Sequence, residues 1–180
     1  MNYYGAKELA AAFRTVRKNT IVIAEEIGAE HYGFRPAPGT RSVAETLLHI
    51  ALTPRVPYQI HAVEHLSDLA KFDFWDFFGA LLVIEKTPHT KERILTLLHE
   101  EGERFAGWLE SLTDEFLAEM VAMPPAVGTQ KSRFEMLLGP KEHEMHHRAQ
   151  LMVVERILGI TPHLTRHMEA RLAAMQSAKA

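Results

Sequence analysis

Apolar residues recur along much of this chain at alternating gaps of three and four, the spacing that places side chains on one face of a helix. This pattern covers three long segments, residues 6–27, 91–112 and 133–158. Ser42 and Glu45 form a capping box that predicts the start of a fourth helix. Pro54 and Pro57 are expected to bend or break that helix. No segment shows the strict alternation of a β-strand, so the pattern predicts an all-α protein.

Prolines and glycines mark the connections between these helices. Residues 28–41 and 123–128 predict loops, because their prolines and glycines do not fit regular structure. Helical character resumes over residues 58–69. The aromatic-rich run 72–78 is placed in a connection, where capping the core or lining an interface is favoured over closing a pocket.

The last third of the chain carries its own boundary signals. Gly139-Pro140 predicts a kink one turn before His143. Gly159 ends the long helix and Pro162 confirms the stop. A short last helix is expected over residues 165–175, so the prediction is a four-helix bundle with a short extra C-terminal helix.

Three histidines fall within five residues of the long helix 133–158. His143 and His147 are four apart, so both imidazoles lie on one face, one turn above the other. This is the spacing at which one helix gives two ligands to one metal ion. The same face is otherwise apolar, and two merely structural histidines there would each need hydrogen-bond partners. His146 lies about 60° from His143 around the helix and is expected at the surface.

A third ligand must come from elsewhere, since a catalytic zinc site has three protein ligands and water. His49 is the best candidate because its neighbours on the second helix are apolar, although a satisfied core histidine remains the alternative. Glu101 falls on the apolar stripe of helix 91–112, either at the stripe's edge or as a partner of the histidine site. The remaining histidines are placed at loops, helix ends or solvent faces: His31, His61, His65, His89, His99, His163 and His167.

Composition narrows the class of protein. The chain has 180 residues, 47% hydrophobic and 24% charged, which predicts a single globular domain over residues 1–180. Its 20 basic and 23 acidic residues are interspersed, so no nucleic-acid or membrane partner is expected. It has no cysteine, which leaves only nitrogen and oxygen ligands for a metal. Without a signal-peptide pattern or an apolar run of about 20 residues, we expect a cytoplasmic protein.

Two blocks of the sequence resemble the DinB-like superfamily, with its YfiT-like relatives. The first is Phe34-Arg35-Pro36, followed by Arg41-Ser42-Val43-Ala44-Glu45 and Leu48-His49. The second is His143-x-x-x-His147-Arg148-x-Gln150-Leu151, followed by Gly159 and Pro162. The blocks occur in the order found in that family, and the resemblance spans residues 8–165.

This resemblance implies a four-helix bundle of up-down-down-up topology that binds one divalent metal ion, zinc or nickel. It implies His49, His143 and His147 as the metal ligands, and a homodimer. Characterised relatives include transferases that use a low-molecular-weight thiol, as well as metal-dependent isomerases and hydrolases. The hypothesis is a metal-dependent enzyme with an open coordination position that acts on a small-molecule substrate, with a low-molecular-weight thiol as a possible cofactor.

Other roles and rival functions follow from the same residues. Gln150 lies one turn beyond His147 as a candidate hydrogen-bond partner of a ligand or substrate, and Glu101 is a candidate proton acceptor. His143-Glu144-x-x-His147 also matches the pattern of zinc peptidases, in which the glutamate is the general base. A non-catalytic, metal-stabilised bundle that binds a small molecule or a partner is a further alternative, as is a metal-dependent hydrolase.

Overall fold

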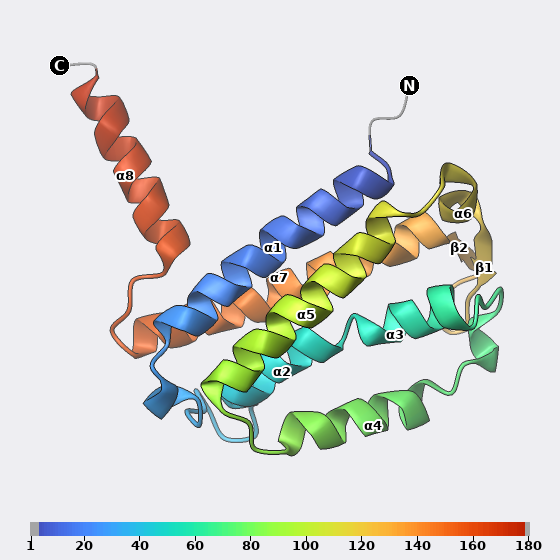
Figure 1. The fold of residues 1–180 in the computed structure, drawn as a ribbon, viewed down its shortest axis with the longest axis horizontal. Coiled ribbons are helices and arrows are strands. Elements are labelled where there is room, and N and C mark those ends of the chain that lie inside the picture. Colours follow the sequence, from blue (N-terminus) through green and yellow to red (C-terminus); the bar gives the residue numbers. More distant parts are fainter. Residues whose placement is uncertain (1–3, 179–180) are drawn as a thin grey trace.

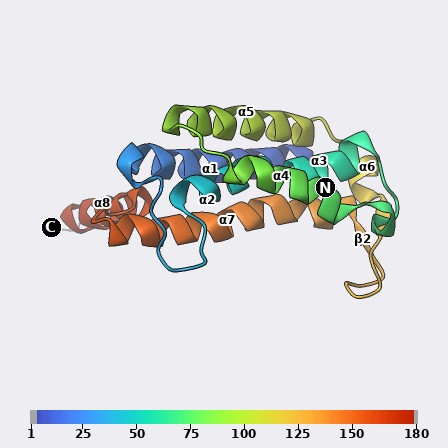
Figure 2. The ribbon, with the colours of Figure 1, turned by 90° about the horizontal axis from the view of Figure 1, so that it is seen from below.

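A computed structural model of the chain describes residues 4–178 as a helical bundle (Figure 1). The four helices of the bundle are α1 (Ala6–Glu26), α2 (Val43–Leu52), α5 (Lys91–Glu110) and α7 (Arg133–Ile157). In both ribbon views α1 and α7 run one way, and α2 and α5 run the other (Figures 1 and 2). The predicted four-helix bundle of up-down-down-up topology is therefore confirmed. No helix of the described residues is long and apolar enough to cross a membrane.

The parallel arrangement of α2 and α5 requires a long return connection, and an additional helix provides it. Helix α4 (Phe74–Lys86) runs back along the bundle before the chain enters α5 (Figure 1). The aromatic run 72–78, expected in a connection, is therefore mostly the first turn of α4. Asp73 caps this turn by accepting a hydrogen bond from the Asp76 amide. Apolar residues of α4, among them Leu81, pack against Leu52.

Short elements join the long ones. After α2 come α3 (Arg55–Tyr58), one π-helical turn (Gln59–Val63) and a 3₁₀ turn (Leu69–Lys71), so the helix expected over 58–69 is interrupted. A further 3₁₀ turn (Ala29–His31) lies in the first loop, and α6 (Asp114–Ala118) follows α5. A small antiparallel sheet accompanies the helices of the predicted all-α fold. Its strands, β1 (Met120–Ala122) and β2 (Gln130–Ser132), are each too short to show an alternating pattern in the sequence.

The C-terminal part of the chain follows the prediction more closely. Pro140 lies inside α7 and does not end it. The chain then turns at Gly159, whose φ of 81° favours glycine, and α8 (His163–Ser177) projects away from the bundle (Figure 1). The short last helix is present and begins two residues before the predicted start.

The described residues form three apolar core clusters, and a buried ion pair lies between the two clusters to which α1 contributes, the two halves of the four-helix core. On α1 the pair's Arg17 lies between Phe13 of one half and Ile23 of the other. Its Nε lies 3.0 Å from Oε1 of Glu144 on α7, and both side chains are buried. The guanidinium also donates to the Ile50 carbonyl at 3.0 Å. That carbonyl has no helical partner, because the residue four positions later is Pro54, which lacks an amide hydrogen.

Gly102 leaves the space that Arg17 needs. A Cβ added at Gly102 would lie 2.8 Å from Cγ of Arg17, closer than real Cβ contacts allow. We therefore expect Gly102→Ala to lower the free energy of unfolding by about 1–3 kcal/mol, the cost of overpacking a core. Gly107→Ala on the same helix is the matched control, since a Cβ there has nothing within 4 Å. It should be neutral or stabilise by up to about 1 kcal/mol, and urea unfolding of both variants measures the difference.

Candidate metal centre

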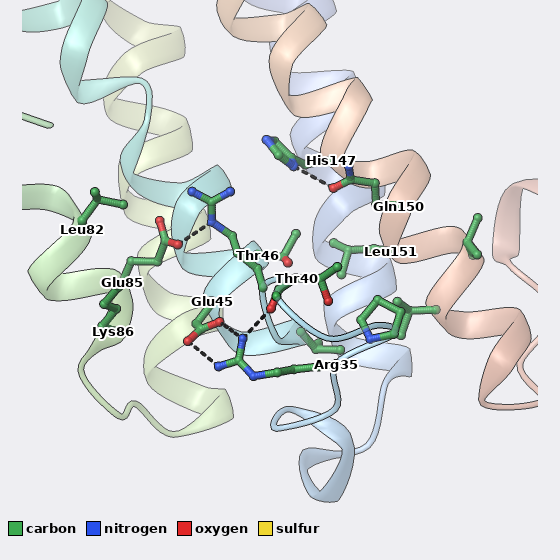
Figure 3. A pocket seen from close by; sticks show the side chains of 16 residues that line it. Arg35, Thr40, Glu45, Thr46, Leu82, Glu85, Lys86, His147, Gln150 and Leu151 are labelled. Atoms are coloured by element: carbon green, nitrogen blue, oxygen red, sulfur yellow. Dashed lines mark hydrogen bonds and ion pairs between the residues drawn. The ribbon is translucent and has the colours of Figure 1, made fainter. Parts of the chain in front are cut away.

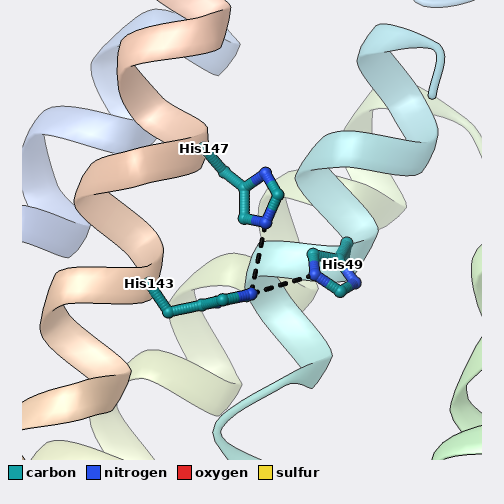
Figure 4. A group of neighbouring side chains, drawn as sticks. All are labelled: His49, His143 and His147. Carbon is teal, nitrogen blue, oxygen red and sulfur yellow. Dashed lines mark hydrogen bonds between the residues drawn. The ribbon is translucent and has the colours of Figure 1, made fainter. Parts of the chain in front are cut away.

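Three imidazoles from two chain-distant helices meet between α2 and α7 (Figure 4). Nε2 of His143 lies 3.1 Å from Nε2 of His49 and 3.2 Å from Nε2 of His147. The three ligand atoms all lie within 4.8 Å of one another. His49 and His147 are buried and His143 is half-buried. The structure thus brings together the three histidines that the sequence singled out.

The outer nitrogens of two rings are already engaged. Nδ1 of His49 lies 3.0 Å from a carboxylate oxygen of Glu85 on α4, and Nδ1 of His147 lies 2.9 Å from the amide oxygen of Gln150. Both partners are acceptors, so each Nδ1 carries the proton and donates it. In the neutral rings, the inward-facing Nε2 atoms of His49 and His147 therefore carry lone pairs.

These lone pairs make the cluster suited to a cation. Both lone pairs point toward Nε2 of His143. A single proton on that nitrogen can be donated to only one of them. A divalent ion at the centre satisfies all three nitrogens. Zinc–imidazole bonds of about 2.0–2.1 Å in a tetrahedral site would put the nitrogens about 3.3 Å apart. The two measured separations, 3.1 and 3.2 Å, are close to that value.

The surroundings of His143 and His147 favour the neutral form of these two rings, which is the form that binds a metal. Burial and the neighbouring imidazoles lower the pKa of His143 to about 4. Burial also lowers the pKa of His147, against the hydrogen bond to Gln150, which raises it. Among residues 4–178, no fourth histidine or carboxylate joins this group.

Glu85 is the carboxylate that orients the site. Its pKa is lowered, because hydrogen bonds from His49 and Arg41 outweigh the effect of burial, which acts in the opposite direction. The ionised carboxylate fixes the His49 tautomer and makes the ring a better ligand. Sequence analysis assigned no role to Glu85, because the helix that carries it was not predicted. Its position four residues after the buried Leu81 was the available signal.

Glu101, the carboxylate that sequence analysis named as a candidate, is engaged elsewhere. Its oxygens bind Arg55 and Arg104, and it makes no hydrogen bond to any of the three histidines. Burial acts to raise its pKa, but the two arginines outweigh burial and lower it. The orienting role for which Glu101 was one candidate is filled by Glu85, because α4 packs against α2 and brings Glu85 to His49.

We expect Glu85→Gln to weaken metal binding about 10- to 100-fold, the usual effect of losing such an orienting carboxylate. Competition with a chromophoric chelator measures the affinity. Glu101→Gln is the matched control, since it neutralises a half-buried carboxylate that does not contact the histidines, and its affinity should equal that of the unmodified protein. Equal affinities for all three proteins would show that Glu85 has no such role.

Two histidines placed at the surface by the sequence prediction are in fact buried. His61 is 2% exposed and His163 is 3% exposed. His61 lies in the π-helical turn and contacts Arg133, the first residue of α7. His163 opens α8 and lies 3.2 Å from the side-chain oxygen of Asn19 on α1. Both errors have one cause, because contacts between distant segments bury these residues.

Two cavities reach the histidine cluster from different sides. A larger cavity of about 890 Å³ reaches His147 and Gln150 (Figure 3), and its lining includes the charged side chains of Arg41 and Lys86. A mostly apolar cavity of about 370 Å³ reaches the other two histidines. Both volumes fall within the range of small-molecule sites, so the cluster is accessible to two different ligands.

Glu144, the general base of the peptidase alternative, is not available for that role. Both of its carboxylate oxygens lie within 3.1 Å of Nε of Arg17, and the side chain is 2% exposed. A general base must reach the proton that it removes. The match to the peptidase pattern is thus explained by a structural ion pair in the bundle core.

Comparison with known proteins gives the chain its family. A sequence model of the DinB superfamily matches residues 12–151. The uncharacterised protein YjoA of Bacillus subtilis is 24% identical over 156 residues, 87% of this chain and 92% of YjoA. The crystal structure of YjoA, a DinB-like protein, matches with a TM-score of 0.63 at 23% identity, covering 86% of this chain and 93% of YjoA.

A second solved structure shares the fold at lower identity. YfiT from Bacillus subtilis, described as a probable metal-dependent hydrolase with an unusual four-helix bundle topology, has a TM-score of 0.69 and 16% identity. The match covers 89% of this chain and 91% of YfiT. The structural likenesses establish the fold, and the family match extends over most of the sequence. This chain belongs to the DinB superfamily.

Proposed function

We propose that this protein is a metal-dependent enzyme that hydrolyses a small, largely apolar molecule at a divalent metal centre formed by His49, His143 and His147. The observation that carries the proposal is the meeting of three Nε2 atoms at the side of an apolar cavity, without a fourth side-chain ligand among residues 4–178. The description of YfiT as a probable metal-dependent hydrolase supports the same class of reaction.

The chemistry divides between the ion and the chain. A divalent ion supplies Lewis acidity, which lowers the pKa of water and polarises a carbonyl oxygen. Glu85 and Gln150 hold two of the rings with their lone pairs directed inward. Phe78, whose ring lies edge-on to His49 at a centroid distance of 6.1 Å, covers that ligand with an apolar group.

The alternative of a purely structural metal is less well supported. Such a site is normally closed by a fourth protein ligand. Glu101 was the candidate for that position, and its carboxylate is taken by two arginines. An open, cavity-facing site is the arrangement of a catalytic centre.

Hydrolysis is tested with a panel of 4-nitrophenyl esters of increasing acyl length. Release of nitrophenolate should require metal, cease with a chelator and return when the metal is restored. His143→Ala should abolish it, and His146→Ala, which changes a histidine outside the cluster, should keep it. A rate that is the same in the chelated and metal-loaded protein would contradict the proposal.

A second candidate is transfer of a low-molecular-weight thiol, and the larger cavity favours it. That cavity is lined by His147 and by neither of the other two histidines, which gives room for a co-substrate in addition to a ligand in the apolar cavity. The chain has no cysteine, so any thiol nucleophile must be brought in. Consumption of 1-chloro-2,4-dinitrobenzene that depends on both metal and added cysteine would support transfer, and consumption independent of the metal would contradict it.

A further inference from the structure

The apolar cavity beside the metal centre contains one polar group that the metal does not explain. The cavity of about 370 Å³ lies between the α2–α3 segment, the π-helical turn, the start of α4 and the middle of α7. It touches His49 and His143, and also His61, which lies about three helical turns further along the chain than His49. Its walls are otherwise mostly apolar and include Pro54, Ile60, Phe74, Phe78 and Met136.

The other polar side chains of this cavity have partners. The Thr53 hydroxyl donates to the His49 carbonyl, and the Glu144 carboxylate is held by Arg17. Within residues 4–178, the hydrogen bond that the His61 ring makes is at Nδ1, so Nε2 is free to bind a ligand in the cavity. The ring as a whole is 2% exposed, so a partner for this nitrogen must enter the cavity that the ring lines.

The contacts of His61 determine which of its nitrogens carries the proton. Nη1 of Arg133 lies 2.8 Å from Nδ1 of His61. A guanidinium can only donate, so Nδ1 accepts and the hydrogen of the neutral ring resides on Nε2. Arg133 is itself fixed, since it is 1% exposed and its Nε donates to Glu119 at 2.8 Å.

The environment also keeps the ring neutral. Burial first, and then the positive charge of Arg133, lower the pKa of His61 to about 4. At neutral pH the ring therefore carries one hydrogen, on Nε2. His61 is a fixed, uncharged donor in the wall of a cavity that reaches the metal centre.

We propose that His61 is a substrate-binding residue whose Nε2–H donates a hydrogen bond to an oxygen atom of the substrate, at a distance from its reacting group. The inference rests on the proposed function and narrows the substrate class. The substrate is a small molecule with its reacting group at the histidine cluster, an apolar middle, and a carbonyl, ether or hydroxyl oxygen that reaches His61. A site built to hydrogen-bond such an oxygen rejects the analogue without it, because the buried donor would lose its partner.

The test uses two matched series of metal-binding probes with the zinc-loaded protein. Phenylalkyl hydroxamic acids with two to five methylene groups place a chelating group at the metal and a ring in the cavity. The second series carries a 4-acetyl group, which adds one hydrogen-bond acceptor. Isothermal titration calorimetry gives both affinities. At one or two chain lengths, the acetyl compound should bind about five-fold more tightly than its parent, the effect of one hydrogen bond.

The variants separate this hydrogen bond from general damage. His61→Leu should abolish the acetyl preference and bind the parent compounds within about two-fold of the unmodified protein. His61→Gln should keep part of the preference, because its amide can accept from Arg133 and still donate. His65→Asn is the control, since His65 contacts the same Glu119 but does not line the cavity.

Each outcome bears on a stated claim. The inference is supported if His61→Leu loses the acetyl preference and the control His65→Asn keeps it. The absence of an acetyl preference at every chain length, or a preference that survives His61→Leu, overturns the inference and leaves the metal centre standing. Failure of both series to bind the zinc-loaded protein overturns the inference and the proposed function together.

Discussion

His143→Ala should reduce the metal content of the purified protein to less than about a tenth of an equivalent, because a site of three ligands retains little affinity when one is removed. His49→Ala should have the same effect, although position 49 is 94 residues away in the chain. Inductively coupled plasma mass spectrometry of protein purified without a histidine tag measures the content.

The control for this prediction is His146→Ala. His146 is exposed on the same helix, and its Nε2 contacts the amide of Gln150 without joining the metal group. This variant should keep most of its metal. If His49→Ala retained metal as well, a site confined to α7 would replace the one proposed here.

Glu144→Ala should lower the free energy of unfolding by about 3–5 kcal/mol, the cost of leaving a buried charge without its partner. The charge left behind is that of Arg17, whose side chain is 5% exposed between the two halves of the core. Urea unfolding monitored by circular dichroism measures the loss.

Arg14→Ala provides the comparison on the same helix. Arg14 pairs with Glu103 and Glu110 at the surface, where ion pairs are worth about 0–1 kcal/mol. Replacing both members of the buried pair, with Arg17→Met and Glu144→Leu, should recover part of the loss, since no buried charge then remains. Equal losses in the free energy of unfolding for Glu144→Ala and Arg14→Ala would show that the buried ion pair stabilises the fold no more than a surface ion pair.

Much of the fold could be predicted from local pattern. The stripes of α1, α5 and α7 are long enough for their helical period to be unambiguous, and their predicted limits fall within two residues of those observed. Ser42 and Ser132 are the N-cap residues of α2 and α7. Helix α4 was missed because its 13 residues begin with a dense aromatic run that obscures the helical period.

The three clustered histidines could be proposed from sequence, because two of them lie one turn apart on the same helix face and the resemblance supplies the third. Their orienting carboxylate could not. Glu85 and Glu101 both lie on otherwise apolar helix faces, and only the packing of α4 against α2 decides which one reaches His49. The Arg17–Glu144 ion pair could not be predicted from sequence either, because its two members are 127 residues apart in the chain.

His61 is the most informative of the residues whose burial the sequence did not indicate. In sequence it is an isolated histidine after two prolines, with nothing to distinguish it from the surface histidines. Its burial depends on Arg133, which lies 72 residues later. Pairs of this kind arise from tertiary structure alone, and they supply the polar groups through which a cavity selects its ligand.

The most direct test of the central claim is the X-ray absorption spectrum of the metal-loaded, untagged protein. Three imidazole nitrogens at about 2.0–2.1 Å from the metal, with one or two further light atoms, is the result that we expect. A shell of oxygen atoms without imidazole scattering would show that His49, His143 and His147 do not share one ion.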